Sequence, residues 1–266
     1  MRIIDPHCHM ISRVTDDYER MALAGIEAVV EPAFWLGSPR TNAGSFIDYF
    51  EMIIGWETQR AKQYGIDHFT CVAMNPREAN NVPLCKDVLP VVEAFCRRET
   101  CVAVGEIGFD RQTYEEESAI RAQLKMAKRF DMPVLIHLPH QFKKPGTERT
   151  LKVVIDEKMN PDRMLLDHNT EETMPLYAGT KFWRGITVYP ITKVSVERAA
   201  NMVQQYGVDR LLINSSCDWG YSDPLSVPKV VIELRKRGFP IDQIEQLVFR
   251  NPIAFFGQSD KWTFKP

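Results

Sequence analysis

The chain of 266 residues has no apolar run that reaches the ~18–20 residues needed to cross a bilayer. It also lacks an initial charged and then apolar segment ending at small residues, so we expect no secretory leader and a cytoplasmic location. There is no basic excess, since 33 Lys and Arg stand against 35 Asp and Glu, a net charge of −2. Strong electrostatic binding to nucleic acid or to a membrane surface is therefore disfavoured.

The six cysteines form no CxxC pair, and a chain of this length needs no disulfide staples. We expect them to be free thiols, mostly buried. The chain contains no Gly- or Ser-rich linker, composition break or internal repeat. With 44% hydrophobic and 26% charged residues it can build a sizeable core, and it predicts one globular domain over residues 1–266.

Short β-branched runs alternate with longer amphipathic stretches from end to end. Several are continuous apolar runs, typical of parallel strands buried on both faces. Eight strands are expected, at Arg2–Asp5, Ala28–Glu31, Phe69–Met74, Cys101–Glu106, Pro133–His137, Met164–His168, Phe182–Val188 and Arg210–Ser215. Eight strand–helix alternations predict an α/β fold, a closed (β/α)8 TIM barrel. An open doubly wound sheet is the alternative, but no Gly-rich phosphate-binding turn follows the first strand.

Helix signals lie between these strands. The stretch Glu115–Phe130 has one apolar face and begins with three acidic residues, which favour a helix N-terminus. Asp242 with Glu245 resembles a capping box that would begin the last helix. We expect that helix to fray near Asn251-Pro252, because the residue before a proline disfavours helical geometry.

Ionisable side chains recur where the predicted strands end. In His7-Cys8-His9 the two imidazoles point to the same side of the strand, because side chains alternate. Two imidazoles on one side can share one metal ion. The position supports this interpretation, since barrel active sites lie at the carboxyl ends of the strands.

The same arrangement recurs further along the chain. Glu106, His137 and His168 end the fourth, fifth and sixth strands at equal spacings of 31 residues, and Asp218 follows the eighth strand, which closure places beside the first. Ionisable groups buried without partners cost several kcal/mol each, so we interpret the set as a metal site. Structural roles stay open for each member. His137 and His168 could donate to carbonyl groups in the core. Glu106 could pair with a buried Arg184, and Asp218 could cap a turn.

The order and spacing of these motifs resemble the TatD-related branch of the amidohydrolase superfamily, over almost the whole chain. The resemblance rests on His7-Cys8-His9, Gly105-Glu106-Ile107-Gly108-Phe109-Asp110, Pro133-Val134-Leu135-Ile136-His137, His168, Asp218 and Asn251-Pro252. It implies a (β/α)8 barrel and metal-dependent hydrolysis. It also implies six ligands for two divalent ions: His7, His9 and Asp218 for one, His137 and His168 for the other, and Glu106 bridging both.

The resemblance implies a mechanism as well. Two close cations lower the pKa of a bridging water towards neutrality and polarise the bond to be cleaved. Asp218 would then accept the proton and pass it to the leaving group. Imidazole and carboxylate ligands suit Zn, Mn, Fe or Ni, and the sequence does not choose among them. We therefore predict a hydrolase for a small-molecule ester, amide or phosphoester.

The sequence departs in two places from the deoxyribonuclease-like members of this family, and both departures narrow the range of expected substrates. Their Glu-Thr-Asp followed closely by Pro is replaced by Ser216-Cys217-Asp218-Trp219, and Pro139 stands where they have an Arg. The missing charges disfavour phosphodiester binding. A TatD-like deoxyribonuclease stays open as an alternative, as does a non-catalytic metal-binding barrel that serves as a binding or scaffold protein.

Four residues are candidates for substrate contact. Phe34 and Trp35, just after the second strand, could line an apolar pocket or form a subunit contact in a homo-oligomer. Asp110 fits a substrate role by resemblance, or a turn cap. His140 could assist proton transfer or face solvent.

Overall fold

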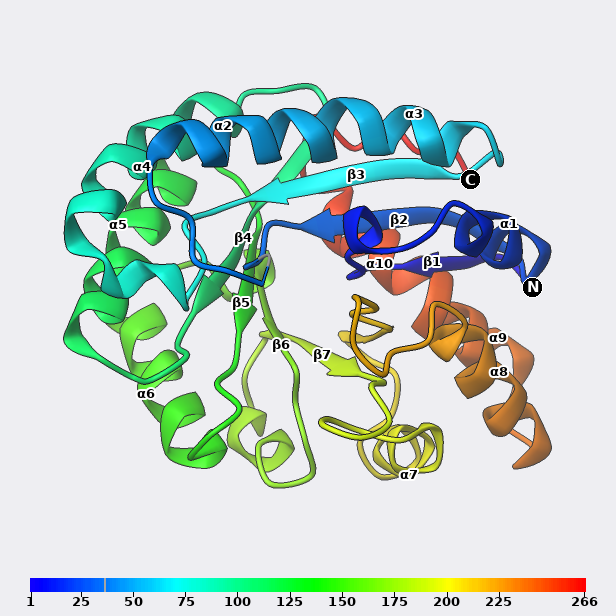
Figure 1. The fold of residues 1–266 in the computed structure, drawn as a ribbon. Coiled ribbons are helices and arrows are strands. Elements are labelled where there is room, and N and C mark those ends of the chain that lie inside the picture. Colours follow the sequence, from blue (N-terminus) through cyan, green and yellow to red (C-terminus); the bar gives the residue numbers. More distant parts are fainter. Residues whose placement is uncertain (36) are drawn as a thin grey trace.

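A computed structural model describes residues 1–35 and 37–266. Eight parallel strands form one sheet in which each strand pairs with the next along the chain (Figure 1). They are β1 (Ile3–Asp5), β2 (Ile26–Pro32), β3 (Asp67–Val72), β4 (Cys101–Gly108), β5 (Val134–His137), β6 (Met164–Asp167), β7 (Trp183–Thr187) and β8 (Leu211–Asn214). All eight predicted strands are confirmed, and the fold is the predicted TIM barrel, nearly closed.

Helices surround the sheet in Figure 1. They are α1 (Asp16–Leu23), α2 (Ala43–Glu51), α3 (Glu57–Lys62), α4 (Val82–Phe95), α5 (Tyr114–Arg129), α6 (Lys143–Asp156), α7 (Val196–Tyr206), α8 (Ser226–Lys236), α9 (Ile241–Glu245) and α10 (Asn251–Phe256). Among the described residues, no helix combines the length and the apolar character that crossing a bilayer requires. All six cysteines are buried free thiols, as expected.

The first and last strands meet beyond their regular ends. The Ser216 amide donates to the His7 carbonyl (2.7 Å), and the His9 amide donates to the Cys217 carbonyl (2.8 Å). The Ser215 amide donates to Asp5 Oδ1 (3.2 Å). These bonds complete the barrel and place the two histidines after β1 beside the segment that follows β8.

The interior of the barrel is filled from all eight strands, and aromatic residues of the C-terminal segment belong to the same cluster. Its buried members are Ile4, Ala28, Val30, Phe69, Cys71, Val102, Ala103, Leu135, Leu165, Trp183, Leu212, Phe249, Phe255, Phe256 and Phe264. A filled interior is typical of TIM barrels and gives the mouth of the barrel a rigid floor.

Helix α5 confirms the predicted stretch, whereas the last helix differs from the prediction. Thr113 and Glu116 form a capping box at the start of α5. Helix α9 has no side-chain cap, and helical structure continues past Asn251 through a π-helical segment, Gln246–Arg250, into α10. The expected fraying is wrong because the π-helical turn places Pro252 in the first turn of α10, where a missing N–H breaks no helical hydrogen bond.

Candidate metal centre

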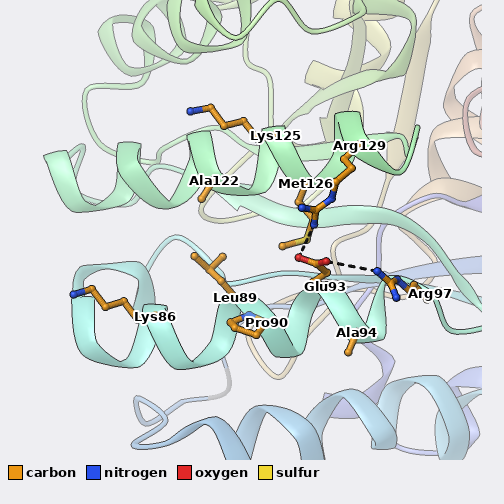
Figure 2. Close-up of a pocket in the computed structure, with 10 residues that line it drawn as sticks. All are labelled: Lys86, Leu89, Pro90, Glu93, Ala94, Arg97, Ala122, Lys125, Met126 and Arg129. Carbon is orange, nitrogen blue, oxygen red and sulfur yellow. Dashed lines mark ion pairs between the residues drawn. The ribbon is translucent and has the colours of Figure 1, made fainter.

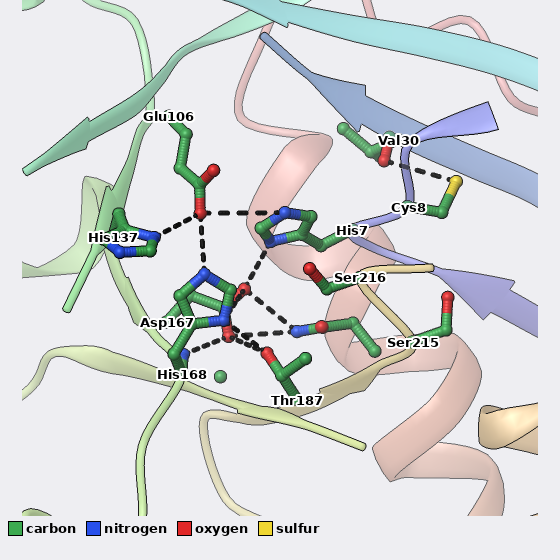
Figure 3. A network of polar contacts seen from close by, with 12 residues as sticks. His7, Cys8, Val30, Glu106, His137, Asp167, His168, Thr187, Ser215 and Ser216 are labelled. Carbon is green, nitrogen blue, oxygen red and sulfur yellow. Dashed lines mark hydrogen bonds and ion pairs between the residues drawn. The ribbon is translucent and has the colours of Figure 1, made fainter. Parts of the chain in front are cut away.

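The strand ends bring one carboxylate and three imidazoles together. Glu106 Oε1 lies 2.7 Å from His168 Nε2, 2.9 Å from His137 Nδ1 and 3.8 Å from His7 Nε2. Figure 3 shows the three rings converging on this oxygen from three separate segments at the ends of strands. Ligand atoms of His7, Glu106 and His168 all lie within 4.8 Å of one another, which makes the group a candidate metal site.

His9 extends the group through His7. The two Nε2 atoms are 3.1 Å apart, and the ring planes are nearly perpendicular. Two nitrogens that ligate one tetrahedral zinc ion at 2.0–2.1 Å lie about 3.3 Å apart. The two ring edges therefore face one point, as the His7-Cys8-His9 pattern predicts.

One ring nitrogen in the cluster supports the presence of an ion. His137 Nε2 is buried and has no hydrogen-bond partner among the described residues. Leaving buried polar atoms unpartnered costs about 1–3 kcal/mol each. Neutral imidazoles with an ionised carboxylate are also the donor set that first-row divalent ions prefer. The residues present therefore fit the metal ions that the sequence implies.

The protonation states suit ligands as well. Burial would raise the pKa of Glu106, but the neighbouring His137 and His7 hold it well below its usual range. Burial lowers the pKa of both His9 and His168 well below theirs. At neutral pH the carboxylate is thus ionised and these two imidazoles are neutral, which is the state that binds metal.

Asp167 positions His7, and the sequence analysis missed it. Its Oδ2 accepts a hydrogen bond from His7 Nδ1 (2.5 Å), and Asn214 Nδ2 donates to both carboxylate oxygens (3.0 Å each). Burial would raise the pKa of Asp167, but His168 and His7 lower it below its usual range. A carboxylate behind a ligating histidine fixes the ring and its tautomer. The available signal was an aspartate at the end of a buried strand, directly before a predicted ligand.

Asp218 lies at the edge of the cluster. Its Oδ1 accepts from the Tyr189 hydroxyl (2.8 Å) and from the Gly220 amide (2.7 Å), so it does cap a turn. Its side chain also lines the cavity at the barrel mouth, together with His9 and Glu106. Metal ligation by Asp218 stays a prediction.

Lys193 is a second residue that the sequence did not reveal. It follows β7, and its Nζ lies 3.2 Å from His168 Nδ1 and donates to Ser216 Oγ (3.1 Å). Thr187 Oγ1 contacts the same His168 nitrogen at 2.6 Å. Burial lowers the pKa of Lys193, and burial together with Lys193 lowers the pKa of Lys143 to about 8. In the sequence, a single lysine in a loop is indistinguishable from a solvated one.

A cavity of about 100 Å³ opens onto the cluster. It is lined by His9, Phe34, Trp35, Glu106, His137, His140, His168, Tyr189, Thr192, Lys193, Ser216 and Asp218. A groove of about 670 Å³ on α4 and α5 is larger (Figure 2). Its one acidic side chain, Glu93, pairs with Arg129 (2.5 Å) and Arg97 (3.6 Å), so the groove offers no free carboxylate for chemistry.

Three of the four candidate substrate residues line the cavity. The Phe34 ring stacks on His9 with centroids 3.7 Å apart, and Trp35 meets His137 edge-on at 5.4 Å. The His140 ring lies 5.2 Å from that of His137. Asp110 is not among the lining residues, and its backbone amide donates to Glu116 at the start of α5 (3.0 Å).

The structural alternatives for the ligands can also be checked. Glu106 does not pair with Arg184, whose guanidinium donates to the carbonyl of Asp209. Nδ1 of His137 and Nε2 of His168 face Glu106 instead of a backbone carbonyl. The geometry therefore favours a shared site over separately satisfied core residues.

Known proteins match this chain over nearly its full length. The model of a family described as TatD related DNase matches residues 4–257. An uncharacterised metal-dependent hydrolase from Methanocaldococcus jannaschii is 28% identical over 258 residues, which cover 96% of this chain and 99% of that protein. A TatD-like protein from Archaeoglobus fulgidus superposes with a TM-score of 0.80 at 24% identity, covering 96% of this chain and 99% of that one.

A phosphotriesterase homology protein from Escherichia coli, solved with phosphate in its active site, has the same fold. It gives a TM-score of 0.68 at 14% identity and covers 96% of this chain and 98% of that one. The family match spans most of the chain, and the relative from M. jannaschii is itself described as a metal-dependent hydrolase. The chain therefore belongs to the TatD related DNase family and is a metal-dependent hydrolase with the amidohydrolase fold.

Proposed function

We propose that this hydrolase cleaves a small-molecule ester, amide or phosphoester, with two divalent ions, Zn, Mn, Fe or Ni, held at the barrel mouth. When bound, the ions would supply a water activated at neutral pH and would polarise the bond to be cleaved. The observation that carries the proposal is the single oxygen of Glu106 that faces imidazoles from β5, from the end of β6 and from the end of β1.

The residues divide into three roles. His7 and His9 would hold one ion, His137 and His168 would hold the other, and Glu106 would contribute to both. Asp218 would accept the proton and pass it on. Its Oδ1 is occupied by Tyr189 and Gly220, and among the described residues its Oδ2 has no hydrogen-bond donor, so Oδ2 is left to accept a proton.

The size of the cavity and the charge of the chain support a small substrate. A volume of about 100 Å³ is well below the ~300–1,000 Å³ typical of pockets for drug-sized ligands. The net charge of −2 provides no general attraction for DNA. Deoxyribonuclease activity is the second candidate, because the family description names it.

The test combines metal analysis with a substrate panel. Protein purified without chelator is analysed for metal, reconstituted with each of the four ions, and assayed on esters, lactones, amides, phosphoesters and DNA. We expect metal-dependent turnover of a small molecule, and we expect Asp218→Asn to lower it by about 10²–10⁴-fold through loss of the proton acceptor. Asp260→Asn, an exposed change near the C-terminus, is the matched control.

Each outcome has a defined meaning. Absence of stoichiometric metal after reconstitution would refute the metal centre. DNA cleavage that Asp218→Asn abolishes would establish the deoxyribonuclease. DNA cleavage that survives this substitution would come from a contaminant.

The cytoplasmic location stays a prediction, and assembly into a homo-oligomer stays an open alternative. Phe34 is only 3% exposed in a single chain, which favours a role in the cavity wall over a subunit contact. Cell fractionation tests the location, and light scattering tests the assembly.

A further inference from the structure

We propose that Lys193, together with Lys143, binds an anionic group of the substrate, a carboxylate or a phosphate, at the mouth of the metal centre. This inference rests on the proposed hydrolytic function and narrows its substrate class to anionic molecules.

Lys193 lines the cavity without an ion-pair contact to a carboxylate of the described residues. Its polar contacts are the Ser216 hydroxyl (3.1 Å) and the His168 ring (3.2 Å). No carboxylate oxygen of the described part of the chain lies within 4.0 Å of its Nζ. A hydroxyl and a neutral ring do not neutralise an ammonium group, and a desolvated charge without a partner is costly.

Lys143, on α6, is not among the residues that line the cavity, but it too has no carboxylate in ion-pair contact. Its Nζ donates to the backbone carbonyl of His168 (2.8 Å), and again no carboxylate of the described residues lies within 4.0 Å. Two largely buried arginines among the described residues do have a carboxylate partner. Arg40 binds Glu78 at 2.6 Å, and Arg60 binds Glu57 at 2.7 Å. Lys193 and Lys143 lack a carboxylate partner of this kind.

The three acids near Lys193 act on it from beyond ion-pair distance, and each has other contacts. Glu106 faces the imidazoles, Asp167 holds His7, and Asp218 accepts from Tyr189. With two divalent ions bound, positive charges at the mouth would outnumber negative ones. A small, partly desolvated cavity amplifies this imbalance, so it attracts anions and repels cations.

Part of the cavity wall is aromatic. Phe34 stacks on Trp219 with centroids 5.2 Å apart, and Trp35 lies next to Phe34 at 6.4 Å. Aromatic faces bind apolar or flat groups. The substrate that fits both features carries an anionic group for the lysines and an apolar part for this wall.

Lys193 could instead have a structural role. Its contact with Ser216 would then tie the loop after β7 to the segment after β8, and this role predicts a different result. A tie would support the metal ligands, so its loss would lower metal content. An anion site would leave metal content intact and weaken only the binding of anions. The experiment therefore measures both quantities.

The probes are inorganic phosphate and benzoate, titrated by calorimetry into metal-loaded protein whose metal content has been measured. Lys193→Met should weaken the binding of at least one probe by about tenfold or more, because it removes a charge-assisted contact. Lys193→Arg should retain most of the affinity, and Lys143→Met should show a smaller loss. Lys144→Met, an exposed neighbour outside the cavity, is the matched control and should bind as the wild type does.

If Lys193→Met weakens the binding of phosphate more than that of benzoate, the substrate carries a phosphate group. If it weakens the binding of benzoate more, the substrate carries a carboxylate. Unchanged affinity of Lys193→Met for both probes, at full metal content, overturns the inference. Loss of metal from Lys193→Met also overturns it, because the lysine would then be a structural tie. Failure of the wild type to bind metal is a separate result, which refutes the proposed function itself.

Discussion

At the scale of single residues, the centre depends on which nitrogen each ring turns towards the cavity. Asp167 accepts from His7 Nδ1, and Thr187 contacts His168 Nδ1, so both rings present Nε2 to Glu106. These second contacts fix ring orientation and tautomer. The proposed ligands were predictable from strand-end positions. Their supports were not, because they depend on side-chain directions that spacing does not encode.

Asp167→Asn tests this support. An uncharged amide cannot reproduce the charged hydrogen bond between the carboxylate and His7. It also places an NH2 group near the Asn214 amide, which donates to Asp167. We expect metal affinity to fall about 10–100-fold. Competition against a chelating dye measures it, with Asp260→Asn as the control. Wild-type affinity in Asp167→Asn would show that His7 needs no such support.

At the scale of elements, an irregularity in β4 positions Glu106. Val104 pairs with Val134, and Ile107 pairs with Ile136, so β4 has one more residue than β5 between the paired positions. An extra residue of this kind redirects side chains relative to regular alternation. The apolar runs predicted the strand and its end. The register shift was not predictable, because it arises from packing against the neighbouring strand.

The contact between β6 and β7 gives a prediction for Gly185. A Cβ at this position would collide with the Asp167 carboxylate, which holds His7. We expect Gly185→Ala to lower the free energy of unfolding by about 1–3 kcal/mol, as overpacking does, and to weaken metal binding as well. Urea unfolding with and without metal measures both effects.

Gly55→Ala provides the comparison for this experiment. Gly55 lies in the π-helical segment Met52–Trp56, and a Cβ there meets nothing within 4 Å. The free energy of unfolding of Gly55→Ala should be unchanged or slightly higher than that of the wild type, because alanine favours helical structure. Equal unfolding curves for the two variants would contradict the predicted collision at Gly185.

At the scale of the whole molecule, closure turns residues that are distant in sequence into neighbours. The sequence predicted this arrangement well, because eight alternations and the equal spacing of Glu106, His137 and His168 define a barrel with one rim of ligands. It could not predict how the loops after β7 and β8 complete the rim. Lys193 and Asp218 reach the cavity through loops whose course follows no periodic pattern.

Removal of metal should therefore destabilise the whole barrel and not one loop. Ligands from β1, β4, β5 and β6 would share the ions, so ions bind the folded chain in preference to the unfolded one. At free metal of 100 times the dissociation constant, this linkage contributes about 2.7 kcal/mol, which for a chain of this size corresponds to a shift of roughly 5 °C in the unfolding midpoint. Calorimetry with saturating metal and with chelator measures the shift. Glu106→Gln, which lacks the bridging charge, should unfold at nearly the same temperature in both conditions. A wild-type midpoint that is equally insensitive to metal would mean that these strand ends do not hold ions together.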